Sequence, residues 1–275
     1  MPDSHEALHD ASAPLEAAVV RFAGDSGDGM QLTGGQFALT TALAGNDLAT
    51  FPDFPAEIRA PAGTTYGVSA FQIRFGSRRI KTIGDQVDVL VVMNPAALKV
   101  NLAEVKPGGL IIADRDAFEP RNLGKAGYAT NPLEDGSLAG YRVMTVDMTR
   151  LTEESVAPFG LGKKAADRCK NMWALGLVYW MFARDRGPTV AWLKAKFASQ
   201  PELADANIAA LNAGHAYAET AELPADVRVY HVEPAQAAPG LYRNVTGTEA
   251  LAWGLVAGAQ LANIGLTFCS YPITP

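Results

Sequence analysis

A short apolar run that leads directly into a cluster of glycines constrains the fold of this chain more than any other feature. Residues 17–23 (AAVVRFA) are apolar and partly β-branched, which is typical of a strand covered on both faces. The run ends in Gly24-Asp-Ser-Gly-Asp-Gly29, and residues 30–43 then place leucine and phenylalanine among small residues, which indicates a helix. Strand, glycine turn and helix open a doubly wound α/β unit.

Later segments continue this alternation. A period of two over residues 64–75 indicates a half-buried strand, whereas the Pro- and Gly-rich stretch 51–63 is expected to be a long loop. Further strands are predicted over 88–93, 110–113 and 141–148. Helices are predicted over 96–104, 171–182, 189–197 and 202–222, and Pro107-Gly108-Gly109 is expected to end the first of them. The fold class predicted is therefore α/β, with a mostly parallel, doubly wound sheet.

Composition shifts divide the chain into four parts. Residues 1–16 are polar and acidic and are expected to be a flexible tail, 17–222 form the α/β domain, and the proline-rich stretch 223–242 is a linker. Within 243–275, Thr246 and Glu249 have capping-box spacing before a predicted helix over 250–263, and 266–271 is predicted as a strand. A helix and one strand cannot stand alone, so this last part is expected to be the incomplete start of a second domain.

Charge and cysteine content exclude several classes of function. The 23 basic and 29 acidic side chains give a net charge of −6, which argues against nucleic acid and anionic membranes as partners. The amino-terminal segment has no secretory pattern and no apolar stretch is long enough to span a bilayer, so a cytoplasmic protein is expected. Two isolated cysteines cannot hold an iron–sulfur cluster, which needs about four thiolates. Four scattered histidines likewise predict no metal site.

The glycine turn is the first candidate site. Glycines between a strand and a helix let backbone N–H groups approach a phosphate, which makes Gly24, Ser26, Gly27 and Gly29 candidate cofactor-binding residues. The spacing Gly-x-x-Gly-x-Gly is neither a dinucleotide fingerprint nor a P-loop, and two aspartates lie in the turn. From spacing alone, a nucleotide-type site and a tight structural turn both remain open.

Two further segments are candidates. Arg59, Gly63, Thr64 and Thr65 lie in a loop whose guanidinium and hydroxyl groups can hold an anion, although a solvated arginine is an equal alternative. The second segment, Tyr271-Pro-Ile-Thr-Pro275, follows a predicted strand, and its two prolines restrict the backbone around Thr274. By composition alone, that segment is a rigid turn.

Longer motifs around these segments resemble the large subunit of the 2-oxoacid:ferredoxin oxidoreductases. The motifs are Phe22-Ala-Gly-Asp-Ser-Gly-Asp-Gly29, Glu57-Ile-Arg-Ala-Pro-Ala-Gly-Thr-Thr-Tyr-Gly67, the KNMWALGLVYW run over 170–180, the NVTGTEALAWGLVAGA run over 244–259, and Tyr271-Pro-Ile-Thr-Pro275. The likeness covers nearly everything from Val19 onward. It implies a gamma domain followed by the first helix and strand of a thiamine-enzyme pyrimidine-binding domain, and overall it is most like the 2-oxoglutarate type.

The resemblance also implies a chemistry. In the family, thiamine diphosphate with Mg and an iron–sulfur cluster, both mainly on a partner beta subunit, support oxidative decarboxylation of a 2-oxoacid, coenzyme A takes the acyl group, and electrons pass to ferredoxin. The reaction is reversible as a reductive carboxylation, as in a reductive TCA cycle. By this resemblance, Thr274 and Tyr271 are the candidate catalytic residues, and the glycine turn and the Arg59 loop are candidates for the phosphates of coenzyme A.

Several expectations follow from this interpretation. The isolated chain is expected to bind neither the iron–sulfur cluster nor thiamine diphosphate tightly. The glycine turn and the Arg59 loop are expected to lie near one another, and Arg59→Ala to weaken coenzyme A binding. The rest of the large subunit is an expected partner, either through a backbone cut after Pro275 or because the chain is a truncation. The alternatives are a nucleotide-binding module of the Rossmann type without catalysis, and a purely structural subunit.

Overall fold

The computed structural model describes residues 14–57, 60–221, 223 and 227–270. The chain divides into two compact units, Met1–Gln236 and Ala237–Pro275. This division falls within the stretch 223–242 that the sequence indicates as a linker. Part of that stretch pairs back on the first unit, since β8 (His231–Val232) forms a small parallel sheet with β1 (Pro14–Leu15).

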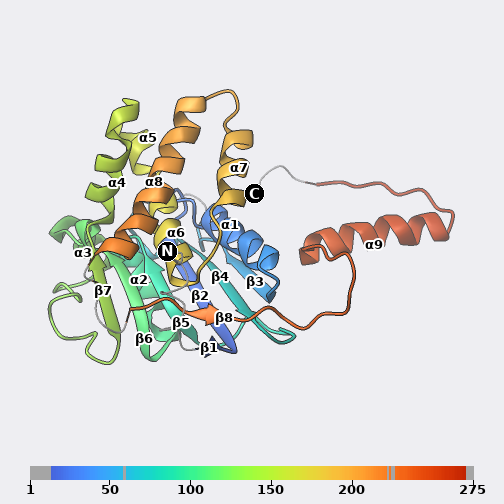
Figure 1. Cartoon of the computed structure of the whole chain (residues 1–275), viewed down its shortest axis with the longest axis horizontal. Coiled ribbons are helices and arrows are strands. Elements are labelled where there is room, and N and C mark those ends of the chain that lie inside the picture. The colour runs from blue at the N-terminus through green and yellow to red at the C-terminus, as the bar shows by residue number, and fades with distance from the viewer. Residues whose placement is uncertain (1–13, 58–59, 222, 224–226, 271–275) are drawn as a thin grey trace, which may run out of the picture. The chain divides into compact units, whose positions relative to one another are not determined.

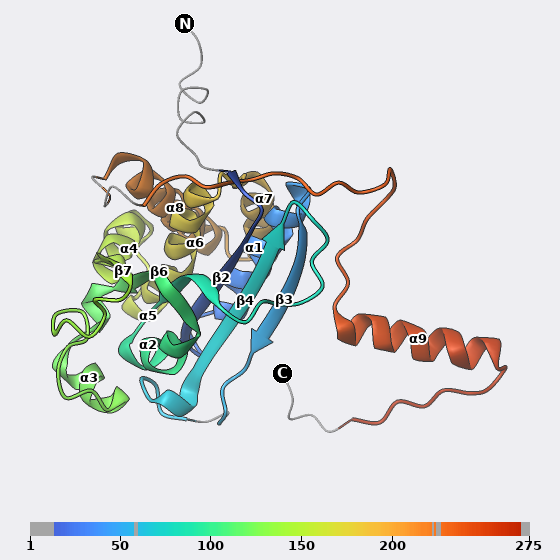
Figure 2. The same cartoon turned by 90° about the horizontal axis from the view of Figure 1, so that it is seen from below.

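A six-stranded sheet forms the centre of the first unit, with the strand order β3-β4-β2-β5-β6-β7 (Figures 1 and 2). The strands are β2 (Ala17–Asp25), β3 (Asp47–Asp53), β4 (Val68–Gly76), β5 (Val87–Val92), β6 (Val105–Asp114) and β7 (Arg142–Val146). The pairs from β2 through β5 and β6 to β7 are parallel, while β4 runs antiparallel to both of its neighbours. The prediction of a mostly parallel α/β sheet is confirmed.

The sheet differs from the sequence prediction in three places. The expected loop over 51–63 contains the end of edge strand β3, where Pro52 is tolerated because an edge strand need not donate on both sides. Strand β4 is buried on both faces rather than half-buried, since helices cover both sides of it. Pro107–Gly109 lies inside β6, beside a register irregularity between Val87 and Val89 of β5, instead of ending a helix.

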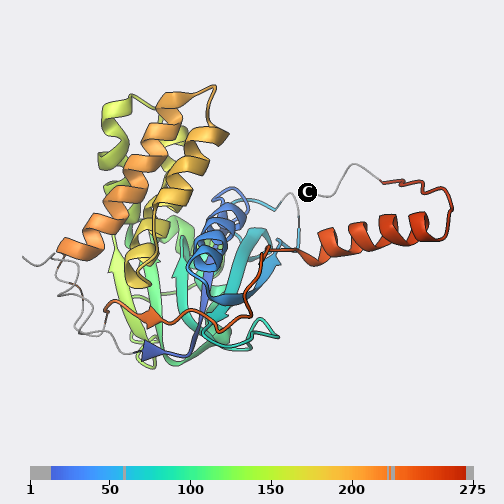
Figure 3. The same ribbon diagram turned by 45° about the vertical axis from the view of Figure 1, so that its right-hand side comes forward.

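Helices cover both faces of the sheet, as in a doubly wound fold. The helices of the first unit are α1 (Met30–Leu43), α2 (Pro95–Asn101), α3 (Pro120–Ala126), α4 (Met148–Val156), α5 (Lys163–Asp167), α6 (Lys170–Met181), α7 (Gly187–Lys196) and α8 (Pro201–Thr220). Helices α3, α4 and α5 were not predicted because each is short, although α4 does bury Met148, Thr152 and Val156 on one face. Figure 3 shows the yellow and orange helices α6 to α8 gathered on one side of the sheet.

Alternate residues of each strand face two separate cores. In β2, Ala18, Val20 and Phe22 join the core under α1, α6 and α8, whereas Val19 and Ala23 join the core under α2 and α3. This division explains why the strands are almost continuously apolar. The first core is the larger, and in it the ring of Phe37 lies within 6.2 Å of four other aromatic rings, those of Phe22, Phe75, Tyr179 and Phe182.

Helices α6 and α8 approach each other closely through two glycines. A Cβ on Gly176 would lie 2.0 Å from the carbonyl oxygen of Leu211, and one on Gly214 would lie 1.9 Å from that of Trp173. No side chain fits at either position, so the two backbones pack against each other directly. As a result α6 is buried on nearly all sides, where its apolar spacing alone predicts a single buried face.

The second unit contains helix α9 (Gly247–Leu261). Its predicted capping box is confirmed: the Thr246 hydroxyl accepts from the Glu249 N–H at 3.2 Å, and the Thr246 N–H donates to the Glu249 carboxylate at 2.9 Å. The sequence predicts a strand over 266–271, but residues 266–270, which the structure describes, do not form one. No described strand pairs with them. Among the described residues, no helix is both long and apolar enough to cross a membrane.

Candidate functional site

The candidate site lies at the edge of the sheet where β2, β5 and β6 end. Parallel strands of doubly wound sheets place ligand-binding groups at this edge, just beyond their carboxyl ends. The glycine turn follows β2 and leads into α1, and Met93 and Asn94 follow β5. The amino end of β4 reaches the same edge because β4 runs antiparallel to β2, with Asp25 opposite Val68.

Two hydrogen bonds join the glycine turn to the loop that precedes β4. The N–H of Ser26 donates to the carbonyl of Gly67 at 3.0 Å, and the N–H of Gly63 donates to the Asp25 carboxylate at 2.8 Å. The prediction that the glycine turn and the loop Arg59–Thr65 lie near one another is confirmed at Gly63. Strand β4 runs antiparallel to β2, so it is the amino end of β4 that brings this loop to the edge. Arg59 lies outside the described residues.

The interior of the glycine turn is filled by one of its own side chains. The Asp28 carboxylate accepts from the Asp25 N–H at 2.8 Å, and it stands 2.7 Å from where a Cβ on Gly24 would be. An internal carboxylate occupies the position that a phosphate takes in a dinucleotide fingerprint. This arrangement argues against the alternative of a Rossmann-type nucleotide module.

Both aspartates of the turn are held in an environment that disfavours their charge. Burial raises the pKa of Asp25, and the neighbouring Asp28 raises it further. Burial also raises the pKa of Asp28, although the nearby Lys170 ammonium lowers it in part. Desolvation penalises an ionised carboxyl, and a second carboxyl nearby adds to the penalty. The turn is therefore a place where a cation, rather than a further anion, is favoured.

That cation is Lys170, at the start of α6. Its Nζ atom lies 2.8 Å from the Asp114 carboxylate, and the same carboxylate accepts from the Thr149 hydroxyl at 2.7 Å. Burial lowers the pKa of Lys170, but Asp114 and Asp28 outweigh this effect and leave the pKa raised. Lys170 thus stays charged between two buried carboxylates and ties the end of β6 to the glycine turn.

A small hollow of about 130 Å³ opens beside Gly27. Its walls are Gly27, Asp28, Met93, Lys164, Asp167, Arg168, Lys170 and Asn171. Nothing lies within 4 Å of the place of a Cβ on Gly27, so this glycine is open to the hollow. Within the described residues, the N–H groups of Gly27 and Gly29 donate to no other group. The exposed cations Lys164 and Arg168 and the N–H of Gly27 are elements of a site for an oxyanion, and the carboxyls of Asp28 and Asp167 line the same hollow.

Gly29 is the one residue of the turn whose backbone requires glycine. Its φ is +76°, in the left-handed region that favours residues without a Cβ. A Cβ there would also meet the amide nitrogen of Asn171 at 2.2 Å. Gly29 is the residue before α1, whose amino end has no side-chain cap. The turn therefore presents its first helical N–H groups without an internal side-chain acceptor.

The remaining predicted site residues either bond within their own loop or lie outside the described residues. The Thr64 hydroxyl donates to the carbonyl of Pro61 at 2.7 Å, so it serves its own loop, and Thr65 begins a 3-10 turn, Thr65–Gly67. Tyr271 and Thr274 lie outside the described residues, as does the position of the expected cut after Pro275. The binding and catalytic roles of all these residues stay predictions.

Sequence reasoning missed the cations of the hollow. Lys164 lies within the short helix α5 and Arg168 directly follows it, and both are exposed, so no apolar periodicity marks them. A usable signal was present: Lys163, Lys164, Arg168 and Lys170 fall within eight residues, in a chain that is acidic as a whole. Four cations so close together indicate an anion partner.

The described residues do not provide ligands for the iron–sulfur cluster or the Mg of the 2-oxoacid:ferredoxin oxidoreductases. No group of three or more histidine, cysteine, aspartate or glutamate side chains is arranged to hold a metal ion within the described ranges. The two cysteines are far apart in sequence, with Cys169 buried and Cys269 exposed. Burial also raises the pKa of the Cys169 thiol to about 11, which makes it a poor ligand.

Fold and site together define a mostly parallel α/β domain with a glycine turn and a small hollow at the carboxyl-end edge of its sheet. The chain belongs to the pyruvate ferredoxin/flavodoxin oxidoreductase family, whose model matches residues 19–217. This match confirms the resemblance from the motifs, and it covers the α/β domain rather than the second unit.

Individual relatives agree with this assignment. The chain is 52% identical, over its whole length, to the 2-oxoglutarate oxidoreductase subunit KorA of Mycobacterium tuberculosis, of which it spans 42%. The solved 2-oxoglutarate:ferredoxin oxidoreductase of Magnetococcus marinus matches 80% of this chain and 34% of its own, with a TM-score of 0.60 and 24% identity. The keto/oxoacid ferredoxin oxidoreductase gamma subunit of Geobacter sulfurreducens matches 75% of this chain and 99% of its own, with a TM-score of 0.51 and 18% identity. These two structures support the fold alone.

Proposed function

We propose that this chain is part of a 2-oxoacid:ferredoxin oxidoreductase that decarboxylates 2-oxoglutarate oxidatively and passes the acyl group to coenzyme A. The observation that carries the proposal is the 52% identity to KorA over the full length of the chain. The chain spans less than half of that relative, so the activity belongs to an assembly and not to this polypeptide alone. The reverse reaction, a reductive carboxylation, uses the same site.

The assembly that we propose contains three kinds of partner. A beta subunit carries thiamine diphosphate, Mg and the iron–sulfur cluster, because the described residues of this chain lack ligands for them. The remaining part of the alpha subunit completes the pyrimidine-binding domain that α9 begins, and ferredoxin accepts the electrons. When bound, thiamine diphosphate supplies the electron sink for decarboxylation. The site of action that we propose is cytoplasmic.

Within this assembly, the glycine turn and its hollow contact the phosphates of coenzyme A. Lys164 and Arg168 supply positive charge at the hollow, and Gly27 lets a phosphate approach the backbone N–H groups. Because Asp28 fills the interior of the turn, the phosphate binds on the outer, Gly27 side. The solved relative of M. marinus carries coenzyme A and succinyl-CoA, which is the co-substrate chemistry proposed for this chain. We propose that Ser26, Arg59, Gly63, Thr64 and Thr65 contact the same ligand.

The activity is tested on the native assembly. Purified with the partner chains that it retains, the protein is expected to reduce ferredoxin only when both 2-oxoglutarate and coenzyme A are present. Steady-state rates with 2-oxoglutarate, pyruvate and a branched-chain 2-oxoacid then rank the substrates by kcat/KM. The 2-oxoglutarate assignment is wrong if another 2-oxoacid has the highest kcat/KM.

The coenzyme A site is tested with two neighbouring lysines. Lys164 lines the hollow, whereas Lys163, on the same short helix, pairs with Glu153 and does not line it. Lys164→Gln is expected to raise the KM for coenzyme A roughly tenfold, since a charge-assisted hydrogen bond contributes about 1.5–3 kcal/mol. Lys163→Gln should leave this KM unchanged, and both variants should keep the KM for 2-oxoglutarate. Equal effects of the two substitutions would remove the hollow from the coenzyme A site.

The two residues with predicted catalytic roles require a separate measurement. We propose that Thr274, with Tyr271 beside it, contacts the carboxylate of the 2-oxoacid. Thr274→Val keeps the shape of the side chain but removes the hydroxyl, so it is expected to raise the KM for 2-oxoglutarate and spare that for coenzyme A. An unchanged KM for 2-oxoglutarate would show that the hydroxyl does not contact the substrate.

A further inference from the structure

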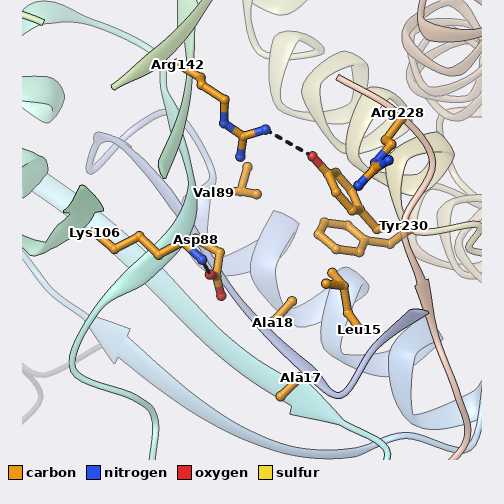
Figure 4. Close-up of a pocket in the computed structure, with 10 residues that line it drawn as sticks. Leu15, Ala17, Ala18, Asp88, Val89, Lys106, Arg142, Arg228 and Tyr230 are labelled. Atoms are coloured by element: carbon orange, nitrogen blue, oxygen red, sulfur yellow. Dashed lines mark hydrogen bonds and ion pairs between the residues drawn. The ribbon is translucent and has the colours of Figure 1, made fainter. Parts of the chain in front are cut away.

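A pocket of about 470 Å³ lies at the amino-end edge of the sheet, where the parallel strands begin, and Figure 4 shows the side chains that surround it. Two of its three cations already have partners within the chain. Lys106 pairs with Asp88, and Arg142 donates to the Tyr230 hydroxyl at 3.3 Å. The charged groups of this pocket therefore do not single out one class of ligand. The hollow beside Gly27 is different, because one of its buried side chains has no partner.

That side chain is Asn171, the second residue of α6. It lines the hollow and is only 8% exposed. Its buried Oδ1 atom accepts no hydrogen bond, and its Nδ2 atom donates none to any other described residue. Buried polar side chains are nearly always hydrogen-bonded, so an unpaired amide that lines a hollow indicates a ligand.

The Asn171 amide lies against the start of α1. A Cβ on Gly29 would stand 2.2 Å from its Nδ2 atom, so a glycine is required for this close approach. The N–H groups of Gly27 and Gly29 also donate to no other described group, and α1 has no side-chain cap at its amino end. Unpaired N–H donors at the start of a helix bind oxyanions, and the helix dipole adds to this attraction. The amide and the helix start therefore point to the same kind of ligand.

Two cations of the hollow also lack a carboxylate partner. Lys164 and Arg168 are exposed, and neither forms an ion pair with an acidic side chain in the part of the chain that the structure describes. Both carboxyls of the lining are engaged elsewhere, since Asp28 accepts a backbone N–H of its own turn and Asp167 pairs with Lys163 at 3.9 Å. The hollow therefore offers a ligand mainly hydrogen-bond donors and cations.

The size of the hollow limits it to one group of a larger ligand. Its volume of about 130 Å³ lies well below the roughly 300 Å³ at which sites for whole small molecules begin. On the basis of the proposed function, in which that ligand is coenzyme A, we infer that the hollow holds the 3′-phosphate of coenzyme A and that the Asn171 amide donates to it. This phosphate is a terminal monoester with about −1.5 to −2 charges at pH 7. The diphosphate, in contrast, is extended at both ends. Asn171 is then the residue that distinguishes coenzyme A from its 3′-dephospho form.

The test compares coenzyme A with 3′-dephospho-coenzyme A as acyl acceptors of the native assembly. The unmodified assembly is expected to have a KM at least roughly tenfold higher for the dephospho form, because the contacts to the phosphate are lost. Asn171→Asp keeps the size of the side chain but replaces the donor by a carboxylate that repels a phosphate. It is expected to raise the KM for coenzyme A roughly tenfold and to leave that for the dephospho form nearly unchanged. A merely structural role of Asn171 would not change this preference.

Asn212→Asp on α8 is the matched control. Its side chain is exposed, does not line the hollow and still offers an oxygen to Arg186, so both KM values should be those of the unmodified assembly. Asn171→Ala, which removes the amide without adding a charge, is the second variant should the first not assemble, and it is expected to reduce the same preference.

Two results would overturn the assignment and leave the proposed function intact. One is an equal KM for the two acceptors in the unmodified assembly. The other is a KM raised by the same factor for both acceptors in the Asn171 variants, which would place the diphosphate or another shared group at the hollow. An assembly that uses neither acceptor would overturn the proposed function, and this inference with it.

Discussion

The two edges of the central sheet differ in how deeply their charged side chains are buried and in the size of the space beside them. At the carboxyl-end edge, the turn after β2 holds two carboxyls whose pKa values burial raises, and Lys170 is enclosed between Asp28 and Asp114. The hollow there is small, about 130 Å³. At the amino-end edge, the pocket of about 470 Å³ has apolar walls and three cations, with Asp88 as its acidic side chain.

The two edges show that a sequence motif does not by itself identify the larger pocket of a fold. The sequence predicts the glycine turn as a candidate phosphate site, yet the Asp28 side chain fills the interior of this turn. The pocket at the other edge carries no motif, because segments that are far apart in the chain supply its walls. At the first edge, the buried Asp114 carboxylate is compensated by Lys170.

The largest effect is expected from Lys170→Met at the carboxyl-end edge. The Asp114 side chain is fully buried, so removing Lys170 leaves this carboxylate without its cation, with only the hydrogen bonds from Thr149. Breaking such a pair costs about 3–5 kcal/mol in the free energy of unfolding. Denaturant titration of the assembly measures this loss. Lys163→Met, which breaks an exposed pair with Glu153, is the control and should give no measurable change. Equal small losses in both variants would mean that the network contributes little.

A smaller loss is expected when a methyl group is added to the glycine turn. Gly29→Ala places a Cβ at a φ of +76° and against Asn171, which costs about 1–3 kcal/mol in the free energy of unfolding. Gly27→Ala meets nothing within 4 Å, so it should change stability by less than about 0.5 kcal/mol. Thermal unfolding of the two variants compares them directly. If Gly27→Ala is the more destabilising, the turn is not folded as described.

At the amino-end edge, Asp88 tests how the strand ends are held. Asp88→Ala leaves the N–H of the buried Val19 without its acceptor and is expected to cost about 1–2 kcal/mol. Asp88→Asn retains an acceptor oxygen and should lose less. Hydrogen exchange at the Val19 amide reports the local effect, with faster exchange expected in Asp88→Ala alone. Exchange that is equally slow in all three proteins would contradict the role of this bond.

The smallest effect is a difference in pH dependence at the carboxyl-end edge. The folded-state pKa of Asp28 is raised above its ordinary value of 3.8, so the folded state binds the proton more tightly than the unfolded state. Stability therefore increases as the pH falls from the raised pKa toward 3.8. This single group contributes at most about 1.4 kcal/mol per pH unit. Asp28→Asn lacks the titrating group and should lose this increase. Parallel pH profiles of the two proteins would show that Asp28 is not perturbed.

Local patterns in the sequence determined much of the fold. The apolar run over 17–23, the helix over 30–43 and the capping box at Thr246 and Glu249 were predicted because each depends on neighbours within a few residues. The mostly parallel sheet followed from the spacing of apolar runs. The sequence also indicated that the glycine turn and the loop before β4 meet at one edge, as the bond between Ser26 and Gly67 confirms.

Only the tertiary structure decided what these elements can bind. Edge strand β3 contains Pro52 and is stabilised by pairing with β4, a contact between segments that no local pattern links. The raised pKa values of Asp25 and Asp28 arise from burial, and burial is set by helices later in the chain. Arg142 and Arg228 meet at one pocket because the chain returns after α8 to pair β8 with β1. Hydrophobic periodicity is a local signal, whereas desolvation and charge clustering depend on which distant segments the fold brings together.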